Sequence, residues 1–479
     1  MISQKLLVLL QNFSKPELRV FYKFLQSSFH NENQDLVKLF KIIETQFQKS
    51  NSNHKENSHF EKKIVWEKIR GSTPFLDEQM RRICSDLTKK AYQFLAYNEF
   101  KKNPMDEFIY LLPTINTPSL NKHFVGATRQ ADFLQKKSTL KNANYHFSKF
   151  NIEYQKYRNQ EINTTKLPDF GNLEKADYHL DAFYIFNKLK NYCDFLAYKN
   201  VTANNPNIHL FPKFLENLKN SPYINEPCIK SYYYIVSMLL HPEDEVFFKN
   251  AKEILEKNYL SFTIQELNTI YIYLKNYCID TKINNGKSEY FQELFDIFKT
   301  LLKKEINFVD GMLDPRDYKN IITVGLHIKE FDWTENFIQN YTIRLPEESQ
   351  DNDLNYNLAK IYFHKGEYEK VIEQLREVEY KNLSYALGGK LMLLKTYYEL
   401  NEVEPLSSLL DSYSIYLRRN KLISREFKQQ YLNVLRFTRK LASLAPYDKP
   451  GIQKLKTQIN NCKALAAKKW LLEKVEALE

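Results

Sequence analysis

Apolar side chains recur every three or four residues along most of the chain, a spacing that predicts amphipathic helices. The longest clear example is predicted over residues 77–102, where Met80, Ile83, Leu87 and Leu95 fall on one face. Strand-like alternation of apolar and polar residues is almost absent. Helices of about 12–25 residues joined by short loops predict an all-α protein in which helix pairs stack on helix pairs.

The breaks between these helices suggest five segments. Residues 161–172 contain Pro and Gly and lack helical periodicity, so they are the best candidate for a linker. The predicted segments are a basic N-terminal helical domain (1–160), a linker (161–172), degenerate helical repeats (173–310), clearer repeats (311–420) and C-terminal capping helices (421–479).

Composition supports the helical prediction. Only 10 of 479 residues are Gly, whereas sheet folds need many tight turns with positive φ. The hydrophobic fraction of 43% is ample for a core, which argues against wholesale disorder. The aromatic fraction of 14% predicts a core rich in Phe and Tyr.

Charge is unevenly spread along the chain. The formal net charge of +11 divides into +10 over residues 1–150, −6 over 151–400 and +7 over 401–479. Two basic ends could meet an anionic partner such as nucleic acid or an acidic protein. However, only 14 of the 69 basic residues are Arg, the residue best suited to bidentate phosphate and base recognition. Solvated lysine-rich helix faces are therefore the simpler interpretation.

The five cysteines are sparse, and no two lie closer than 35 residues in the chain. This spacing predicts free, mostly buried thiols in a reducing compartment rather than a disulfide framework or a zinc site. The N-terminus lacks the features of a secretory signal, and no apolar stretch is long enough to cross a membrane. We therefore expect a cytoplasmic protein with no membrane partner.

One segment carries a regular set of large, small and turn residues. Its key positions are Leu358, Ala359, Tyr362, Gly366, Tyr368, Val371 and Leu375. The small Ala359 allows two helices to approach closely, Gly366 turns the chain between them, and Tyr362 and Tyr368 fill the wedge. The pattern resembles a tetratricopeptide repeat, whose period is about 34 residues. The resemblance implies a right-handed α-solenoid of helix hairpins.

Two further copies flank this segment. A forward shift of 35 residues places Asn401 at the turn, where its tolerance of left-handed backbone is suitable. A backward shift of 35 residues gives a weaker copy, with Phe331 in place of the glycine. Separately, the stretch from Trp66 to Phe75 is similar to a family of large, uncharacterised bacterial helical-repeat proteins, which implies no activity.

Tetratricopeptide-like repeats bind protein or peptide partners in a groove lined by their first helices. Carried over by position, the groove residues would be Lys329, Lys360, Phe363, His364, Lys395, Tyr398 and Glu399. A family clamp for an acidic C-terminus needs paired Asn and Lys or Arg positions. Lys360 and Lys395 match it in part, but Asp353 and Gly388 occupy the leading positions. Ordinary solvated helix residues are the alternative interpretation.

The helix pair over residues 60–102 is faintly similar to the helix-turn-helix of winged DNA-binding domains, which some bacterial regulators join to tetratricopeptide repeats. Its basic residues are Arg81, Arg82, Lys89 and Lys90. Acidic Asp77, Glu78 and Asp86 lie on the same predicted helix, and no hairpin follows that could form a wing. This similarity implies a nucleic-acid-binding regulator as the second hypothesis.

No phosphate-binding, dinucleotide-binding, nucleophile-elbow or zinc-protease motif occurs in the chain. The ten histidines are scattered, and no compact set of metal ligands accompanies them. We therefore expect no catalytic, cofactor-binding or metal site. The leading hypothesis is a non-enzymatic scaffold that binds a protein or peptide, and neither its partner nor its oligomeric state follows from the sequence.

Overall fold

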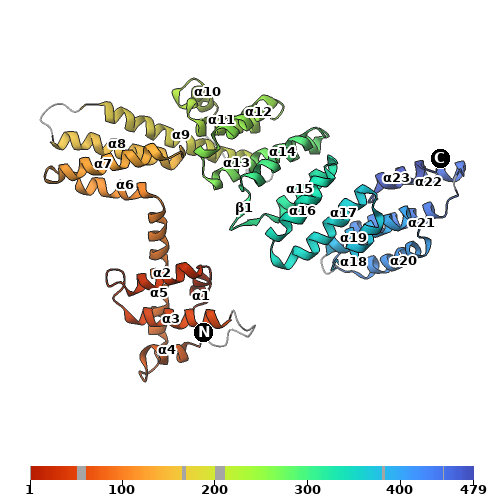
Figure 1. The fold of residues 1–479 in the computed structure, drawn as a ribbon, viewed down its shortest axis with the longest axis horizontal. Helices are drawn as coiled ribbons and strands as arrows, with labels where there is room; N and C mark the ends of the chain where they lie inside the picture. Colours follow the sequence, from red (N-terminus) through yellow and green to blue (C-terminus); the bar gives the residue numbers. More distant parts are fainter. Residues whose placement is uncertain are drawn as a thin grey trace. The chain divides into compact units, whose positions relative to one another are not determined.

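A computed structural model describes residues 2–50, 61–163, 169–199, 211–379, 383–445 and 447–478 (Figure 1). The fold is all-α, with about 81% of residues in helices. Two short strands, β1 (Phe308–Val309) and β2 (Met312–Leu313), pair as an antiparallel hairpin. The predicted fold class is therefore confirmed at the level of an all-α protein.

The helices follow one another with short connections. The first eight are α1 (Gln4–Gln11), α2 (Lys15–Gln26), α3 (Gln34–Ser50), α4 (Lys62–Arg70), α5 (Asp77–Lys102), α6 (Pro104–Ile115), α7 (Asn121–Lys137) and α8 (Ala143–Asn163). The next eight are α9 (Gly171–Lys199), α10 (Phe211–Lys219), α11 (Pro227–Leu240), α12 (Glu245–Asn258), α13 (Ile264–Asn276), α14 (Tyr290–Lys303), α15 (Pro315–His327) and α16 (Phe331–Tyr341).

The last seven are α17 (Gln350–Lys365), α18 (Tyr368–Arg376), α19 (Leu383–Glu399), α20 (Val403–Arg419), α21 (Arg425–Ala442), α22 (Lys449–Asn461) and α23 (Lys468–Glu476). Single helical turns connect some of them: η1 (Pro118–Leu120), η2 (Pro222–Asn225), η3 (Tyr259–Ser261), η4 (Tyr277–Lys282, a π-helix), η5 (Ile283–Asn285), η6 (Thr342–Arg344) and η7 (Glu347–Ser349).

The described chain divides into two compact units. The first contains residues 2–194, 211–233 and 260–262, and the second contains 195–199, 234–259 and 263–478, each without the undescribed residues inside these ranges. The predicted segment 173–310 contains residues of both units, and the predicted segment boundaries remain predictions. Of the predicted linker 161–172, residues 164–168 lie outside the described residues, while the residues beside them belong to the ends of α8 and α9.

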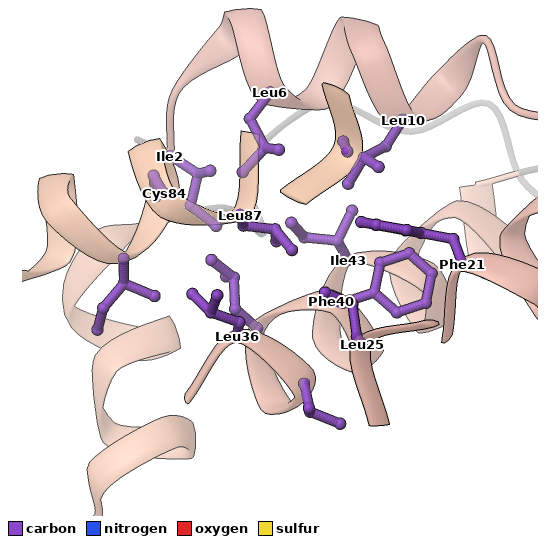
Figure 2. Packing of buried hydrophobic residues seen from close by; sticks show 14 of the residues in the cluster. Ile2, Leu6, Leu10, Phe21, Leu25, Leu36, Phe40, Ile43, Cys84 and Leu87 are labelled. Atoms are coloured by element: carbon purple, nitrogen blue, oxygen red, sulfur yellow. The ribbon is translucent and has the colours of Figure 1, made fainter. Parts of the chain in front are cut away.

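The N-terminal helices enclose a core of their own within the first unit (Figure 2). Leu6 and Leu10 from α1, Phe21 from α2, Phe40 from α3 and Leu87 from α5 are all fully buried in it. A capping box begins α2, with the Ser14 and Glu17 side chains bonded reciprocally to backbone N–H groups. The start of α2 is thus fixed locally, which directs its apolar face toward α3 and α5.

In the second unit, helices pack against their neighbours in sequence, as the pairs α15–α16, α17–α18 and α19–α20 show. The first helices of these pairs also contact each other, α15 with α17 and α17 with α19. The helices therefore form three successive hairpins whose first helices lie in a continuous row. Buried Ala359, Val371 and Leu375 fill the middle hairpin, as the spacing of small and large residues predicts.

The same turn closes all three hairpins. Its central residues, Lys329, Gly366 and Asn401, have φ values of 65°, 78° and 58°. In each turn the N–H of the following Glu donates to a carbonyl five residues earlier, at 2.9 Å. This is the Schellman motif, which satisfies carbonyl groups that a helix end leaves unpaired.

The turns at Gly366 and Asn401 lie where the sequence predicts them, 35 residues apart. The first turn falls at Lys329, which lies 37 residues before Gly366, and not at Phe331. Phe331 instead begins α16. The first spacing is therefore two residues longer than the second. The additional residues fit the connection between α16 and α17, which contains the two short helices η6 and η7.

Candidate partner-binding site

The predicted groove residues occupy the row of first helices. Lys360, Phe363 and His364 lie on α17, and Lys395, Tyr398 and Glu399 lie on α19. Lys329 does not share this position. It lies two residues beyond the end of α15, in the left-handed turn, and is exposed.

Lys360 lies half-buried on α17. Its Nζ donates to Asn357 Oδ1 at 3.3 Å and lies 4.6 Å from the centre of the Tyr356 ring. Burial lowers the pKa of Lys360 to about 8; the charge of Lys319 on α15 adds to this effect, and Asp353 opposes it. Among the described residues, no carboxylate lies within ion-pair distance of Lys360. Its ammonium group is therefore incompletely neutralised.

Lys395 on α19 has similar surroundings. Its Nζ lies 5.8 Å from the centre of the Phe363 ring and 5.6 Å from that of Trp470 on α23. Burial lowers the pKa of Lys395, while the charges of Glu473 and Glu399 raise it. The aromatic faces stabilise the cation partly, because a ring quadrupole replaces only some of the hydration that burial removes.

His364 lies near both of these lysines. Burial lowers the pKa of His364, and the charges of Lys395 and Lys360 lower it further. The three lysines Lys319, Lys360 and Lys395, one from each first helix, are called the lysine row here. Electrostatic coupling within this set, including His364, indicates a cationic face that would gain from an anionic ligand.

Tyr398 and Glu399 have intramolecular partners instead. The Tyr398 ring packs edge-on against Trp470 with centroids 5.4 Å apart. The Glu399 carboxylate accepts a hydrogen bond from Trp470 Nε1 at 2.9 Å and another from Lys474 Nζ at 2.7 Å. The C-terminal helix α23 thus covers the end of α19, where the sequence predicted a partner.

Sequence reasoning missed Lys319, Tyr356 and Trp470 as parts of this surface. A local signal existed only for Tyr356, because a glycine inside a helix, Gly388, indicates close packing at that position. A Cβ atom at Gly388 would come within 2.1 Å of the Tyr356 hydroxyl oxygen. Trp470 lies 71 residues from Glu399 in the chain, and no repeat pattern relates the two positions.

The four basic residues proposed for nucleic-acid binding lie on α5 and have partners within the first unit. Arg81 pairs with Asp77, and Arg82 and Lys89 lie 4.0 Å and 3.1 Å from Asp86. Lys90 donates to the backbone carbonyl of His30. Neighbouring carboxylates therefore reduce the positive potential that these residues would offer to a phosphate backbone.

The described residues contain no cluster of three or more His, Cys, Asp or Glu side chains placed to hold a metal ion. None of the described helices combines the length and apolarity that crossing a bilayer requires. Compared with protein-family models, with curated proteins and with solved structures, the chain matches none.

Proposed function

We propose that the protein is a non-enzymatic scaffold that binds a carboxylate-bearing segment of a partner protein along the lysine row. We further propose that residues 311–420 form a right-handed, tetratricopeptide-like solenoid. The repeated Schellman turns and the contiguous first helices support this architecture. The free cysteines of the described chain accord with a protein of the reducing cytoplasm.

One observation carries the proposal. Lys360 and Lys395 are half-buried against aromatic rings, yet neither has a carboxylate within ion-pair distance among the described residues. An incoming carboxylate would supply the missing charge in surroundings of reduced dielectric, where a charge-assisted hydrogen bond is strong. The adjacent Tyr356 and Phe363 rings would contact the apolar part of the same segment.

The proposal is tested by charge reversal in the full chain. The wild-type protein, the double variant Lys360→Glu/Lys395→Glu and the control variant Lys428→Glu are each used to capture partners from native lysate. Lys428 is a half-buried lysine on α21 outside the row. We expect a stoichiometric partner that is retained by the control and lost by the double variant.

Retention of the same partners by all three proteins would contradict the lysine row as the binding surface. Binding to random duplex DNA is measured in parallel as a function of salt. Tight binding that weakens steeply with salt, because counterions are released, would favour the alternative of a nucleic-acid-binding regulator.

A further inference from the structure

A second concave surface lies in the same unit, away from the lysine row. It is an open groove of about 600 Å³ between α14, the β1–β2 hairpin and α16, and it contains none of the residues of the row. We call it the aromatic groove. Its volume falls within the range of about 300–1,000 Å³ that is typical of ligand sites.

The aromatic groove is named for a stripe of rings on α16. Trp333, Phe337 and Tyr341 recur every four residues, with neighbouring ring centroids 5.6 Å and 5.0 Å apart. Phe308 from β1 continues the stripe, 6.2 Å from Tyr341. Phe337 is only 3% exposed, whereas the other three rings are half-buried and leave apolar surface open.

The stripe is held in place by the core behind it. Phe295 from α14 packs edge-on against Trp333, with centroids 4.7 Å apart, and Tyr318 from α15 packs against Phe337 at 5.4 Å. Rings fixed in this way lose little conformational entropy when a ligand binds, and this preorganisation favours affinity.

Polar groups line the two sides of the stripe. Exposed Asn336 and Asn340 lie one helical turn apart on α16. Lys303 and Arg344 have no carboxylate within ion-pair distance among the described residues. The Arg344 guanidinium is oriented by its hydrogen bond to the Gly311 carbonyl at 3.2 Å and lies 6.0 Å from the centre of the Phe308 ring.

We propose that the aromatic groove binds a short extended peptide in which an aromatic or aliphatic side chain lies within one or two residues of an Asp or Glu. The rings receive the apolar side chain, and Lys303 and Arg344 pair with the carboxylate. Asn340 Nδ2 donates to the Asn336 backbone and side-chain oxygens, so Asn336 Nδ2 is the donor and Asn340 Oδ1 the acceptor offered to the peptide backbone. This site is independent of the proposed function of the lysine row.

The charges favour a peptide over a single-stranded nucleic acid. Glu305 contributes a carboxylate to the groove lining, and Lys299 is already paired with Asp296 at 2.7 Å. A strand carrying a phosphate at every nucleotide would meet that carboxylate. A peptide with one acidic residue can place its single charge between Lys303 and Arg344.

The test uses a phage-displayed library of random dodecapeptides and the full-length protein. The library is first depleted on Lys303→Glu/Arg344→Glu and then selected on the wild-type protein. We expect enrichment of sequences with an aromatic or aliphatic residue beside an acid. The most enriched peptide, labelled with fluorescein, should bind at least about tenfold more weakly to Lys303→Ala/Arg344→Ala by fluorescence anisotropy.

Lys303 and Arg344 are exposed, so these variants keep the core, and their helicity is verified by circular dichroism. Lys428→Glu and Lys360→Glu/Lys395→Glu should bind the peptide as the wild type does. The proposal would be overturned by enriched sequences without acids, by no enrichment, or by a peptide that binds the wild type and both groove variants with equal affinity. Tighter, variant-sensitive binding of a ten-nucleotide oligothymidylate would assign the groove to nucleic acid instead.

Discussion

At the scale of single residues, the most informative positions are the left-handed turns that close the three hairpins. Gly adopts positive φ without a steric penalty, whereas Lys brings its Cβ close to the backbone there. Gly366 therefore suits its position, and Lys329, with a φ of 65°, does not. The first hairpin carries local strain that the middle hairpin avoids.

Exchanging these residues should change stability in opposite directions. We expect Lys329→Gly to raise the free energy of unfolding by about 0.5 kcal/mol and Gly366→Lys to lower it by about 1 kcal/mol. The urea midpoint followed by circular dichroism measures both changes. Lys329→Ala, which keeps a Cβ atom at positive φ, is the matched control and should not stabilise the protein.

The lowered pKa of Lys360 predicts that partner binding depends on pH. Because its pKa is lowered to about 8, it loses its charge between pH 7 and pH 9, a range in which an ordinary lysine remains protonated. A bound carboxylate favours the protonated form, so affinity for the captured partner should fall up to about tenfold over this range. Isothermal titration of Lys360→Met should show a weaker affinity that changes less with pH over this range.

The residue types themselves explain which turns could be predicted. Gly and Asn at positive φ are recognisable in a sequence, and Gly366 and Asn401 were placed correctly. Lysine gives no such signal, so the turn at Lys329 had to be inferred from a constant 35-residue spacing. Because the connection before α17 is longer, the expected position of the turn was two residues beyond the observed one.

At the scale of elements, a buried ion pair joins α13 to α15. Lys275 and Asp317 are 8% and 7% exposed, and Lys275 Nζ donates to the two carboxylate oxygens at 2.6 Å and 2.8 Å. Asn307 Nδ2 donates to the same carboxylate at 3.2 Å, which connects the pair to the segment before the β1–β2 hairpin. The pair thus links α13 directly to the first helix of the α15–α16 hairpin.

Removing one member of this pair should be costly. We expect Asp317→Leu to destabilise the second unit by about 3–5 kcal/mol, because Lys275 would remain buried without a counter-charge. The double variant Lys275→Met/Asp317→Leu should recover most of this loss. Urea unfolding of the wild type and the three variants, including Lys275→Met, provides the complete double-mutant cycle. Equal stability of Asp317→Leu and the double variant would contradict this account.

A second buried polar contact joins α8 to α9 in the first unit. His146 Nδ1 and His179 Nδ1 lie 3.0 Å apart, so one imidazole donates and the other accepts. Burial lowers the pKa of each to about 4. The charge of Lys141 lowers the pKa of His146 further; the charges of His146 and Lys149 lower the pKa of His179, which Glu226 and Glu153 oppose. The folded protein therefore holds both rings neutral.

This pair predicts a loss of stability in mild acid. The neutral pair stabilises the fold fully above the ordinary histidine pKa of about 6.5, and this contribution is lost as the pH falls toward about 4. We expect the wild-type melting temperature to fall more between pH 7 and pH 5 than that of His146→Gln/His179→Gln. Parallel pH profiles would exclude the histidine pair as the cause.

The element scale also shows what the sequence could not reveal. Helix periodicity placed the long helix 77–102 and the repeat hairpins well, since these depend on residues three or four positions apart. The cover of α19 by α23 depends instead on Trp470 and Lys474 meeting Glu399 across more than 70 residues. That contact gave two predicted groove residues, Tyr398 and Glu399, partners within the protein.

At the scale of the whole molecule, each unit combines segments that are separate in the chain. Residues 260–262 belong to the first unit although the segments around them belong to the second. Simple truncation at residue 194 would therefore separate residues that pack together. The N-terminal core is different, because all of its buried members lie between Ile2 and Phe94.

This difference predicts the behaviour of two fragments. We expect residues 1–102 to form a helical fragment with a cooperative thermal transition, because the fragment retains its complete core. Residues 1–160 add the small core of α6, α7 and α8, but α8 would lose the ring contact between Phe147 and Phe183 and the contact with His179, so we expect the added helices to unfold at a lower temperature than the N-terminal core. Differential scanning calorimetry of both fragments would test this. A second, more stable transition in the longer fragment would contradict it.

The arrangement of α23 also determines how the protein would respond to force. A hairpin of 35–37 residues that contacts mainly its neighbours can detach as one step, releasing at most about 130 Å of extended chain. The C-terminal end has no such free hairpin, because α23 packs on α21 and its side chains bond to Glu399 on α19. Pulling on that end would first have to break the contacts of α23 with α21 and α19. The preceding hairpins would then unfold one after another.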